Sequence, residues 1–463
     1  MRVSNINSAK IPRRPDAGLQ GAAIAKAPPC HHQERSEDVS FIEQKVLTRR
    51  RAVAGILCMR SQAFSISAVA VTAAFVLSIA TAAAVTTDVI FSFEEEGGEY
   101  ADTDLETDSA GNIYGTTVLG GDFGSGTVFQ LSPTPNGWMH TVLYSFTGGA
   151  DGGEPYKGVT IDREGNLYGT AVTGGSGSCE GGCGVAYKLT NSGGNWSQTV
   201  IHAFTGGDDG SGPGARLTVD RGGNIYGMAP TGGANGLGTI YRIRQASGAW
   251  TFNVIHTFTG GDDGATGSAG RMVLRRARLY GAATTGGAHG SGVIFELSPR
   301  AVGEWDFRTI YAFNGQPDGS FPYGALLFAG SGKIYGTTYY GGTNGIGAVY
   351  ELSPRRNGEW NENVIYSFQE GSDGNSPISN LVSDSVGNLY GTTSEGGLGS
   401  GTIFKLSPIG GGQWTETVVH SFQGPPDGGF AYNGMVVDRL GNFYGATVHG
   451  GENDDGSVYK FTP

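Results

Sequence analysis

Short stretches of alternating apolar and polar residues, separated by turns, recur from about residue 88 to the end of the chain. In one such unit, residues 378–382 form an apolar stretch, and residues 388–393 follow after a turn. Residues 401–406 then alternate as a half-buried strand does, and residues 414–422 form a fourth stretch. Gly, Pro, Asn and Asp fill the connections. Each unit is therefore predicted to be a four-stranded antiparallel meander.

The motif Gly-Asn-Leu-Tyr-Gly, or a close relative of it, occurs seven times. Its tyrosines are separated by 54, 58, 54, 55, 55 and 54 residues. They are Tyr114, Tyr168, Tyr226, Tyr280, Tyr335, Tyr390 and Tyr444. A period this regular indicates a repeat architecture. Seven units of four short strands predict an all-β fold, a seven-bladed β-propeller.

The two ends of the repeat array complement each other. Residues 89–93 resemble a fourth strand without the first three, and residues 456–461 resemble a third strand without the fourth. An open array would need capping repeats, whereas a ring hides its strand edges. We therefore predict that the N-terminal strand pairs with the last blade and closes the propeller.

All six tryptophans stand eight residues before a phenylalanine. They are Trp138, Trp196, Trp250, Trp305, Trp360 and Trp414. Because eight is even, both rings of each pair point to one face of a regular strand. The regularity favours packing between blades over an array of sugar-stacking surfaces.

The first 84 residues share nothing with the repeats. Residues 1–58 are predicted to be disordered, or to precede a true translation start at Met59. Residues 59–84 have a basic flank, an uncharged apolar run and an Ala-rich end, which is typical of a secretory signal peptide. The alternative is an uncleaved membrane anchor. Cleavage near Val85 would leave residues 85–463 as the mature propeller, exported, monomeric and without a membrane span.

Charge and cysteine content indicate which compartment and which kinds of partner suit the protein. The chain has 82 glycines and only 16% charged residues, which suits a turn-rich β protein. Residues 85–463 carry 19 basic and 37 acidic side chains, and this acidic surface argues against nucleic acid as a partner. Cys179 and Cys183 lie in the only lengthened repeat, where a disulfide would pin an inserted loop in an oxidising compartment.

Three motifs carry a resemblance to a known family. They are Gly-Asn-Leu-Tyr-Gly-Thr-Thr, Gly-Thr-Val/Ile-Phe-x-Leu-Ser-Pro and Val-Ile-Tyr-Ser-Phe-x-Gly-x-x-Asp-Gly, and they span residues 88–463. The chain resembles the GloVer tandem-repeat proteins, a bacterial extracytoplasmic group. Asp-x-x-Gly-Asn-Leu-Tyr is more distantly similar to NHL and gluconolactonase-type propellers. The resemblance implies export but no established activity, and this chain ends without a sorting tail.

One loop position carries an aspartate before glycine in six of the seven blades. These residues are Asp151, Asp209, Asp263, Asp318, Asp373 and Asp427. A ring of carboxylates could hold Ca²⁺, the only cofactor that the sequence suggests. The alternative is that each Asp stabilises its own turn.

Catalysis needs unlike groups at one point, so positions that break the seven-fold pattern are the candidates. The residue before the Gly-Gly pair is Tyr340, Glu395 and His449 in three consecutive blades, with Tyr339, Asp454 and Asp455 nearby. Glu395 and His449 could act as acid and base, and the whole group could bind a ligand. Variation of loop residues on an acidic surface is the alternative.

No nucleophile elbow, phosphate loop, zinc signature or nucleotide fingerprint is present in the sequence. The sequence therefore favours a secreted or cell-surface, non-catalytic propeller that binds a glycan or a protein through its loop-rich face. The alternative is an extracellular enzyme of the lactonase, lyase or glycosidase kind, with a central acidic site that could depend on calcium.

Overall fold

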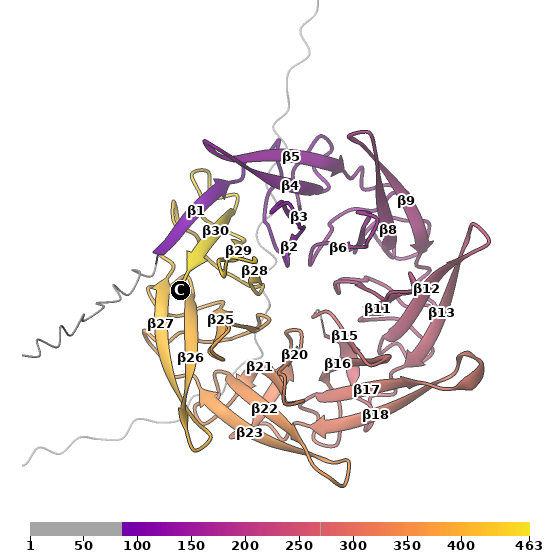
Figure 1. The fold of residues 1–463 in the computed structure, drawn as a ribbon. Coiled ribbons are helices and arrows are strands. Elements are labelled where there is room, and N and C mark those ends of the chain that lie inside the picture. The colour runs from indigo at the N-terminus through magenta and orange to yellow at the C-terminus, as the bar shows by residue number, and fades with distance from the viewer. Residues whose placement is uncertain (1–85, 269) are drawn as a thin grey trace, which may run out of the picture. The chain divides into compact units, whose positions relative to one another are not determined.

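The structure is a computed structural model that describes residues 86–463 except residue 269. The predicted N-terminal arm and signal peptide therefore lie outside the described residues. Seven antiparallel sheets follow one another around a ring (Figure 1). This is the predicted all-β, seven-bladed propeller.

Each blade contributes one short inner strand. These strands are β2 Glu106–Thr107, β6 Thr160–Ile161, β10 Thr218–Val219, β15 Val273–Arg275, β20 Leu327–Phe328, β24 Val382–Ser383 and β28 Val436–Val437. The second strands are β3 Ile113–Thr117, β7 Leu167–Ala171, β11 Ile225–Ala229, β16 Arg278–Thr285, β21 Ile334–Gly341, β25 Leu389–Thr393 and β29 Phe443–Thr447. The second strands carry the Tyr-Gly motif.

The outer half of each blade is longer. The third strands are β4 Thr127–Thr134, β8 Val185–Ser192, β12 Thr239–Ala246, β17 Val293–Pro299, β22 Ala348–Pro354, β26 Thr402–Gly410 and β30 Ser457–Thr462. The fourth strands are β5 Gly137–Ser145, β9 Asn195–Ala203, β13 Ala249–Thr257, β18 Trp305–Ala312, β23 Trp360–Ser367, β27 Gln413–Ser421 and β1 Thr86–Ser92. Blades 4 and 5 add β14 Ala265–Gly267 and β19 Gly319–Pro322, and a 3-10 turn spans Ala301–Gly303.

The last blade combines both ends of the described chain. Strand β1 pairs antiparallel with β30, with Thr86 opposite Thr462 and Ser92 opposite Ser457 (Figure 1). The blade order is therefore β28, β29, β30 and β1. Whether this pairing is what holds the ring closed stays a prediction.

The core lies between neighbouring blades. The phenylalanine at the end of each fourth strand is fully buried; the seven are Phe93, Phe146, Phe204, Phe258, Phe313, Phe368 and Phe422. Trp138 packs edge-on against Tyr444 of the preceding blade, and Trp305 does the same against Tyr226. The tryptophans thus contribute to blade-to-blade packing.

The Tyr-Gly motif has two structural causes. At Gly169 an added Cβ would lie 2.3 Å from the hydroxyl of Tyr187 on the third strand, so only glycine fits. The motif tyrosine reaches the turn between the first and second strands. Tyr390 donates to Asp384 at 3.2 Å, and Asp384 also accepts from the backbone N–H groups of Val386 and Asn388. The Asp-x-x-Gly-Asn turn and the tyrosine therefore form one unit.

In blades 4 and 5 the acidic residue of this unit lies on the third strand and the basic residue lies in the turn. Their turns lack the Asp, and a glutamate on the third strand replaces it. Tyr335 donates to Glu351 at 2.9 Å, while Lys333 from the turn pairs with the same carboxylate. In blade 4, Arg278 and Glu296 form the corresponding pair at 2.6 Å. Most other blades carry the basic residue on the third strand, at the position of Glu296 and Glu351.

The first strands are shorter than the sequence pattern predicts. The apolar stretch at residues 378–382 yields only β24. Before β24, a side-chain hydroxyl takes the place of a backbone acceptor in the sheet: Ser379 accepts from the backbone N–H of Thr392 at 2.8 Å. Thr103 does the same for Thr116 in blade 1, at 3.0 Å. The segments that precede the first strands, here called the inner segments, are therefore not part of the backbone hydrogen-bond ladder and can turn toward the ring axis.

Within residues 86–463, no helix is long and apolar enough to cross a membrane.

Candidate functional site

The six Asp-Gly aspartates each serve their own turn. Asp151 accepts from the backbone N–H of Thr147 at 2.9 Å and from the hydroxyl of Tyr144 at 2.9 Å. Where the strand carries histidine, as in His202, the ring Nε2 contacts Asp209 at 3.0 Å. Asp263, Asp318, Asp373 and Asp427 repeat this arrangement.

No group of three or more His, Cys, Asp or Glu side chains that could hold a metal ion occurs in the part of the chain that the structure describes. The turn arrangement gives each aspartate a structural reason to recur in six blades. A calcium site built from these residues stays a hypothesis.

The symmetry-breaking residues before the Gly-Gly pairs fall into two groups. In the first, the rings of Tyr339 and Tyr340 lie 4.3 Å apart, and the charge of Glu395 acts on the Tyr340 hydroxyl. In the second, His449 Nδ1 lies 3.8 Å from Asp454. Burial and the charge of Asp454 raise the pKa of Asp455. No hydrogen bond or ion pair joins Glu395 to His449 among the described residues.

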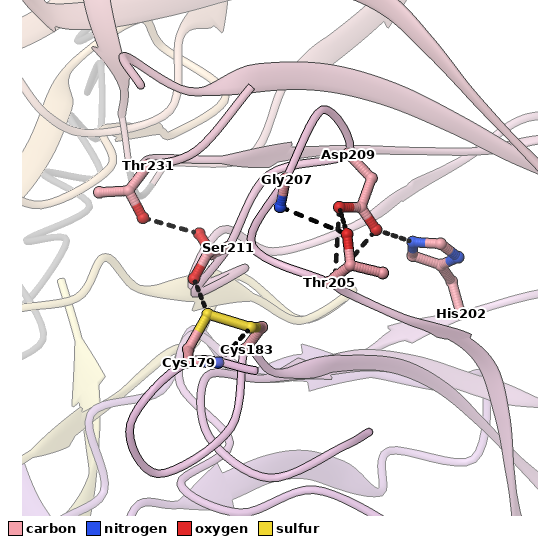
Figure 2. Close-up of a disulfide and its surroundings, with 8 residues drawn as sticks. All are labelled: Cys179, Cys183, His202, Thr205, Gly207, Asp209, Ser211 and Thr231. Atoms are coloured by element: carbon pink, nitrogen blue, oxygen red, sulfur yellow. Dashed lines mark hydrogen bonds and ion pairs between the residues drawn. A yellow bond between two sulfur atoms is a disulfide. The ribbon is translucent and has the colours of Figure 1, made fainter. Parts of the chain in front are cut away.

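The inserted loop of blade 2 is held by a disulfide between Cys179 and Cys183 (Figure 2). Cys183 is fully buried. Cys179 Sγ lies 3.4 Å from the hydroxyl of Ser211, and the backbone carbonyl of Cys183 accepts from Gly212. The disulfide therefore ties the insertion to the loop that leads into blade 3.

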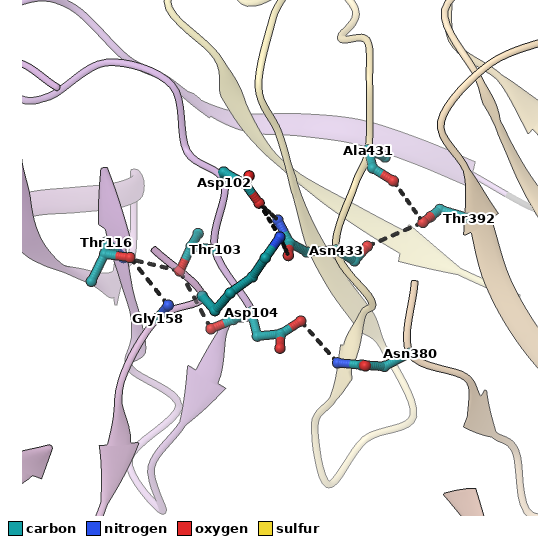
Figure 3. Close-up of polar contacts among 10 residues, drawn as sticks. Asp102, Thr103, Asp104, Thr116, Gly158, Asn380, Thr392, Ala431 and Asn433 are labelled. Atoms are coloured by element: carbon teal, nitrogen blue, oxygen red, sulfur yellow. Dashed lines mark hydrogen bonds and ion pairs between the residues drawn. The ribbon is translucent and has the colours of Figure 1, made fainter. Parts of the chain in front are cut away.

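A polar cluster that sequence reasoning missed lies on the ring axis. Lys157 of blade 2 donates to Asp102 of blade 1 at 2.5 Å and to Asn433 of blade 7 at 2.9 Å. Asn433 donates in turn to Asp102 at 2.7 Å (Figure 3). Lys157 and Asn433 are both buried. Segments up to 331 residues apart in the sequence thus share one network.

A second polar layer lies one or two residues further along the same inner segments. Asp104 accepts from Asn380 at 2.9 Å (Figure 3). Arg216 is buried, pairs with Glu106 and donates to the backbone carbonyl of Leu105 at 3.3 Å. Burial, and then the nearby Arg271, lower the pKa of Arg216.

The axial cluster forms the floor of a cavity of about 300 Å³. Asp102 and Lys157 line it together with Tyr156 and Tyr323. Val172 and Thr284, which follow or end second strands, also line it, so it opens on the face that carries the connections from the second to the third strands. We call this cavity the axial mouth.

Electrostatic coupling links further aromatic and acidic groups to the axial mouth. Burial, followed by the charges of Asp102 and Glu395, raises the pKa of Tyr432. Burial, the largest single effect, lowers the pKa of Lys157, but Asp102, Tyr323 and Asp104 together outweigh it, and the pKa is raised. Lys157 is therefore a cation at neutral pH, and the site combines charged, amide and phenol groups.

The sequence contained a signal for the second polar layer. The residue just before the first-strand leucine or its equivalent is Asp104, Gly158, Arg216, Arg271, Ala325, Asn380 and Gly434 around the ring. This position breaks the seven-fold pattern more strongly than the one before the Gly-Gly pairs. Comparing every repeat position for charge would have located it.

The repeats match the Gloeobacter/Verrucomicrobia repeat model at residues 71–273, 134–316 and 279–463. The chain belongs to this family. The resemblance drawn from its motifs is thereby confirmed. In this family member, the repeats supply the blades, and the axial cluster is formed where the inner segments differ. No curated protein matches the chain.

The chain also shows a distant similarity to several solved structures. A putative 6-phosphogluconolactonase from Bacteroides uniformis is 14% identical over 73% of this chain and 88% of its own, with a TM-score of 0.47. A protein from Lactobacillus plantarum is 15% identical over 76% and 87%, with a TM-score of 0.46. A protein of unknown function from Dyadobacter fermentans is 11% identical over 71% and 96%, with a TM-score of 0.40.

Proposed function

We propose that this protein is an exported, non-catalytic binding propeller that holds a neutral carbohydrate in the axial mouth. The supporting observation is the convergence of two partly exposed tyrosines, Tyr156 and Tyr323, with the charged side chains of Asp102 and Lys157 in this cavity. Tyr432 and Asn433 line a smaller cavity that shares Lys157 and Tyr323 with it.

The chemistry of the axial mouth suits a sugar. Phenol rings offer apolar faces against which the C–H face of a pyranose packs, and their hydroxyls remain polar. Asp102 and Lys157, which line the cavity, offer an acceptor and a donor for sugar hydroxyls. The carboxylates of Asp102 and Asp104 both act on Lys157, so its charge is already compensated and a neutral sugar is favoured over an anionic one.

Binding is favoured over catalysis because the ionisable groups already neutralise each other. Asp102 accepts from both Lys157 and Asn433. A general base needs a carboxylate that is free to take a proton from the substrate. The buried ion pair instead gives a fixed, pre-organised surface, which is what specific binding needs.

The test is a glycan array probed with the purified propeller, residues 85–463, followed by calorimetry with the selected oligosaccharide. We expect Tyr323→Ala to weaken binding by roughly tenfold, about 1.4 kcal/mol. The Tyr323 side chain donates no hydrogen bond in the structure's described part, so the variant should fold.

Phe123→Ala is the matched control. Phe123 is an aromatic residue that is 60% exposed in the connection between the second and third strands of blade 1, on the same face as the axial mouth. Its removal should leave affinity unchanged. The proposal fails if no glycan binds, or if the two variants lose affinity equally.

A further inference from the structure

The basic side chains are unevenly distributed along this acidic chain. Of the 19 Lys and Arg residues within 85–463, 13 lie within residues 216–356. The exchanged ion pairs of blades 4 and 5 contribute to this bias, because they place Arg278 and Lys333 in turns where other blades carry Asn. These turns lie on the face opposite the axial mouth.

A groove between blades 4 and 5 concentrates this charge. It has a volume of about 590 Å³, and Arg275, Arg276 and Arg278 line it together with Phe328 and Trp360. The guanidinium of Arg275 lies over the Phe328 ring, 4.8 Å from its centre. This packing fixes the cation at the groove wall.

Two of the three arginines have no counter-charge. Arg278 is paired with Glu296. No acidic side chain within the described residues forms an ion pair with Arg275 or Arg276, and Arg276 is exposed at the tip of the turn. Their charge is therefore available to a ligand.

The basic surface continues into the next groove. Between blades 3 and 4 a second groove of about 600 Å³ is lined by Trp305, by three arginines and by one aspartate, Asp220, so its charge is net positive; the arginines are Arg221, Arg242 and Arg276. Arg276 lines both grooves. A ligand with repeated negative charges could therefore contact both grooves at once, which a single small anion could not.

The equivalent groove between blades 7 and 1 gives an internal comparison. It has a similar volume, about 510 Å³, and a tryptophan, Trp138. Its lining has two acidic side chains, Asp108 and Asp438, and two basic ones, Arg439 and Lys460, and Arg439 is exposed. Grooves of similar volume therefore recur around the ring, but the excess of positive charge is found in the two grooves of blades 3 to 5.

We propose that the two arginine-lined grooves between blades 3, 4 and 5 bind an acidic oligosaccharide that carries carboxylate groups. Guanidinium groups form bidentate hydrogen bonds with carboxylates. The indole of Trp360 or Trp305 supplies an apolar face for the sugar ring beside each cation. Polyglutamate would use the charge but has no ring to place against the indoles.

The test is affinity electrophoresis and calorimetry of the propeller, residues 85–463, with oligogalacturonate. Binding should weaken as NaCl rises from about 50 to about 200 mM, because each neutralised charge releases counterions. Arg276→Glu should reduce affinity by roughly tenfold or more. The residue is exposed and unpaired, and unchanged thermal melting will verify that the variant folds.

The control variant is Arg439→Glu, which changes the net charge equally in the comparison groove. It should bind oligogalacturonate within about twofold of the parent protein. Equal losses in both variants, or no binding at low salt, would overturn the proposal. Equally tight binding of polyglutamate would also overturn it, because the ligand would then be chosen by charge alone. Since the grooves and the axial mouth lie on opposite faces, these outcomes do not depend on neutral sugar binding.

Discussion

At the scale of single residues, Gly169 shows why the repeat motif ends in glycine. The second strand passes so close to Tyr187 that a Cβ would lie 2.3 Å from the Tyr187 hydroxyl. We expect Gly169→Ala to lower the free energy of unfolding by about 1–3 kcal/mol through overpacking. Gly330→Ala is the control, because an added Cβ there meets nothing within 4 Å. Urea unfolding of both variants measures the difference, and equal stabilities would contradict the packing argument.

Two carboxyl groups between blades should make stability depend on pH. Burial, and then the charge of Asp318, raise the pKa of Glu362 to about 7. Burial and the charge of Asp373 do the same for Glu416. Because the folded pKa lies above the unfolded value of about 4.5, the folded state holds the proton more tightly. Stability is therefore present below pH 4.5 and is lost as pH rises through 7.

We expect the melting temperature to fall between about pH 5 and pH 8, with a cost on the order of 1–2 kcal/mol per carboxyl. Glu362→Gln and Glu416→Gln together should remove most of this fall. The comparison is a series of thermal melts across this pH range. A slope that the double variant retains in full would show that other groups cause it.

At the scale of strands, the pairing of β1 with β30 makes the last blade depend on the first residues of the propeller. Six residues of β1 have partners in β30. We expect removal of residues 86–92, with the buried Phe93 retained, to lower the free energy of unfolding by about 3 kcal/mol or more. The exposed edge of β30 should also promote self-association.

Chemical unfolding and sedimentation velocity test this closure prediction, with residues 86–463 as the reference protein. Retaining Phe93 keeps the fully buried side chain of this cluster, whereas Ile90 and Phe91, which pack at its edge, are lost together with the strand pairing. A truncated protein that stays monomeric with unchanged stability would refute the view that β1 holds the ring closed.

Most of the blade could be predicted from sequence, and the reasons are local. Alternation of side chains gives the third and fourth strands, and turn residues give their connections. The first strands were overestimated because the hydroxyls of Ser379 and Thr103 replace strand hydrogen bonds. A hydrophobic pattern cannot distinguish a hydroxyl that accepts from a neighbouring strand from one that faces solvent.

At the scale of the whole molecule, the repeats make the scaffold and the deviations from them make the site. Positions that recur in nearly every blade, such as the Asp-Gly aspartates, are used within their own turns. The axial network joins Lys157 to Asn433, which are 276 residues apart in the sequence. No local pattern predicts such a contact, because it exists only once the ring has formed.

The central claim is that a neutral sugar binds on the ring axis. A crystal structure of residues 85–463 with the oligosaccharide selected on the glycan array tests it most directly. We predict a sugar ring against Tyr323, with hydroxyl groups within hydrogen-bonding distance of Asp102 and Lys157. A sugar bound instead on the outer fourth strands, or beside Trp360 on the opposite face, would contradict the account.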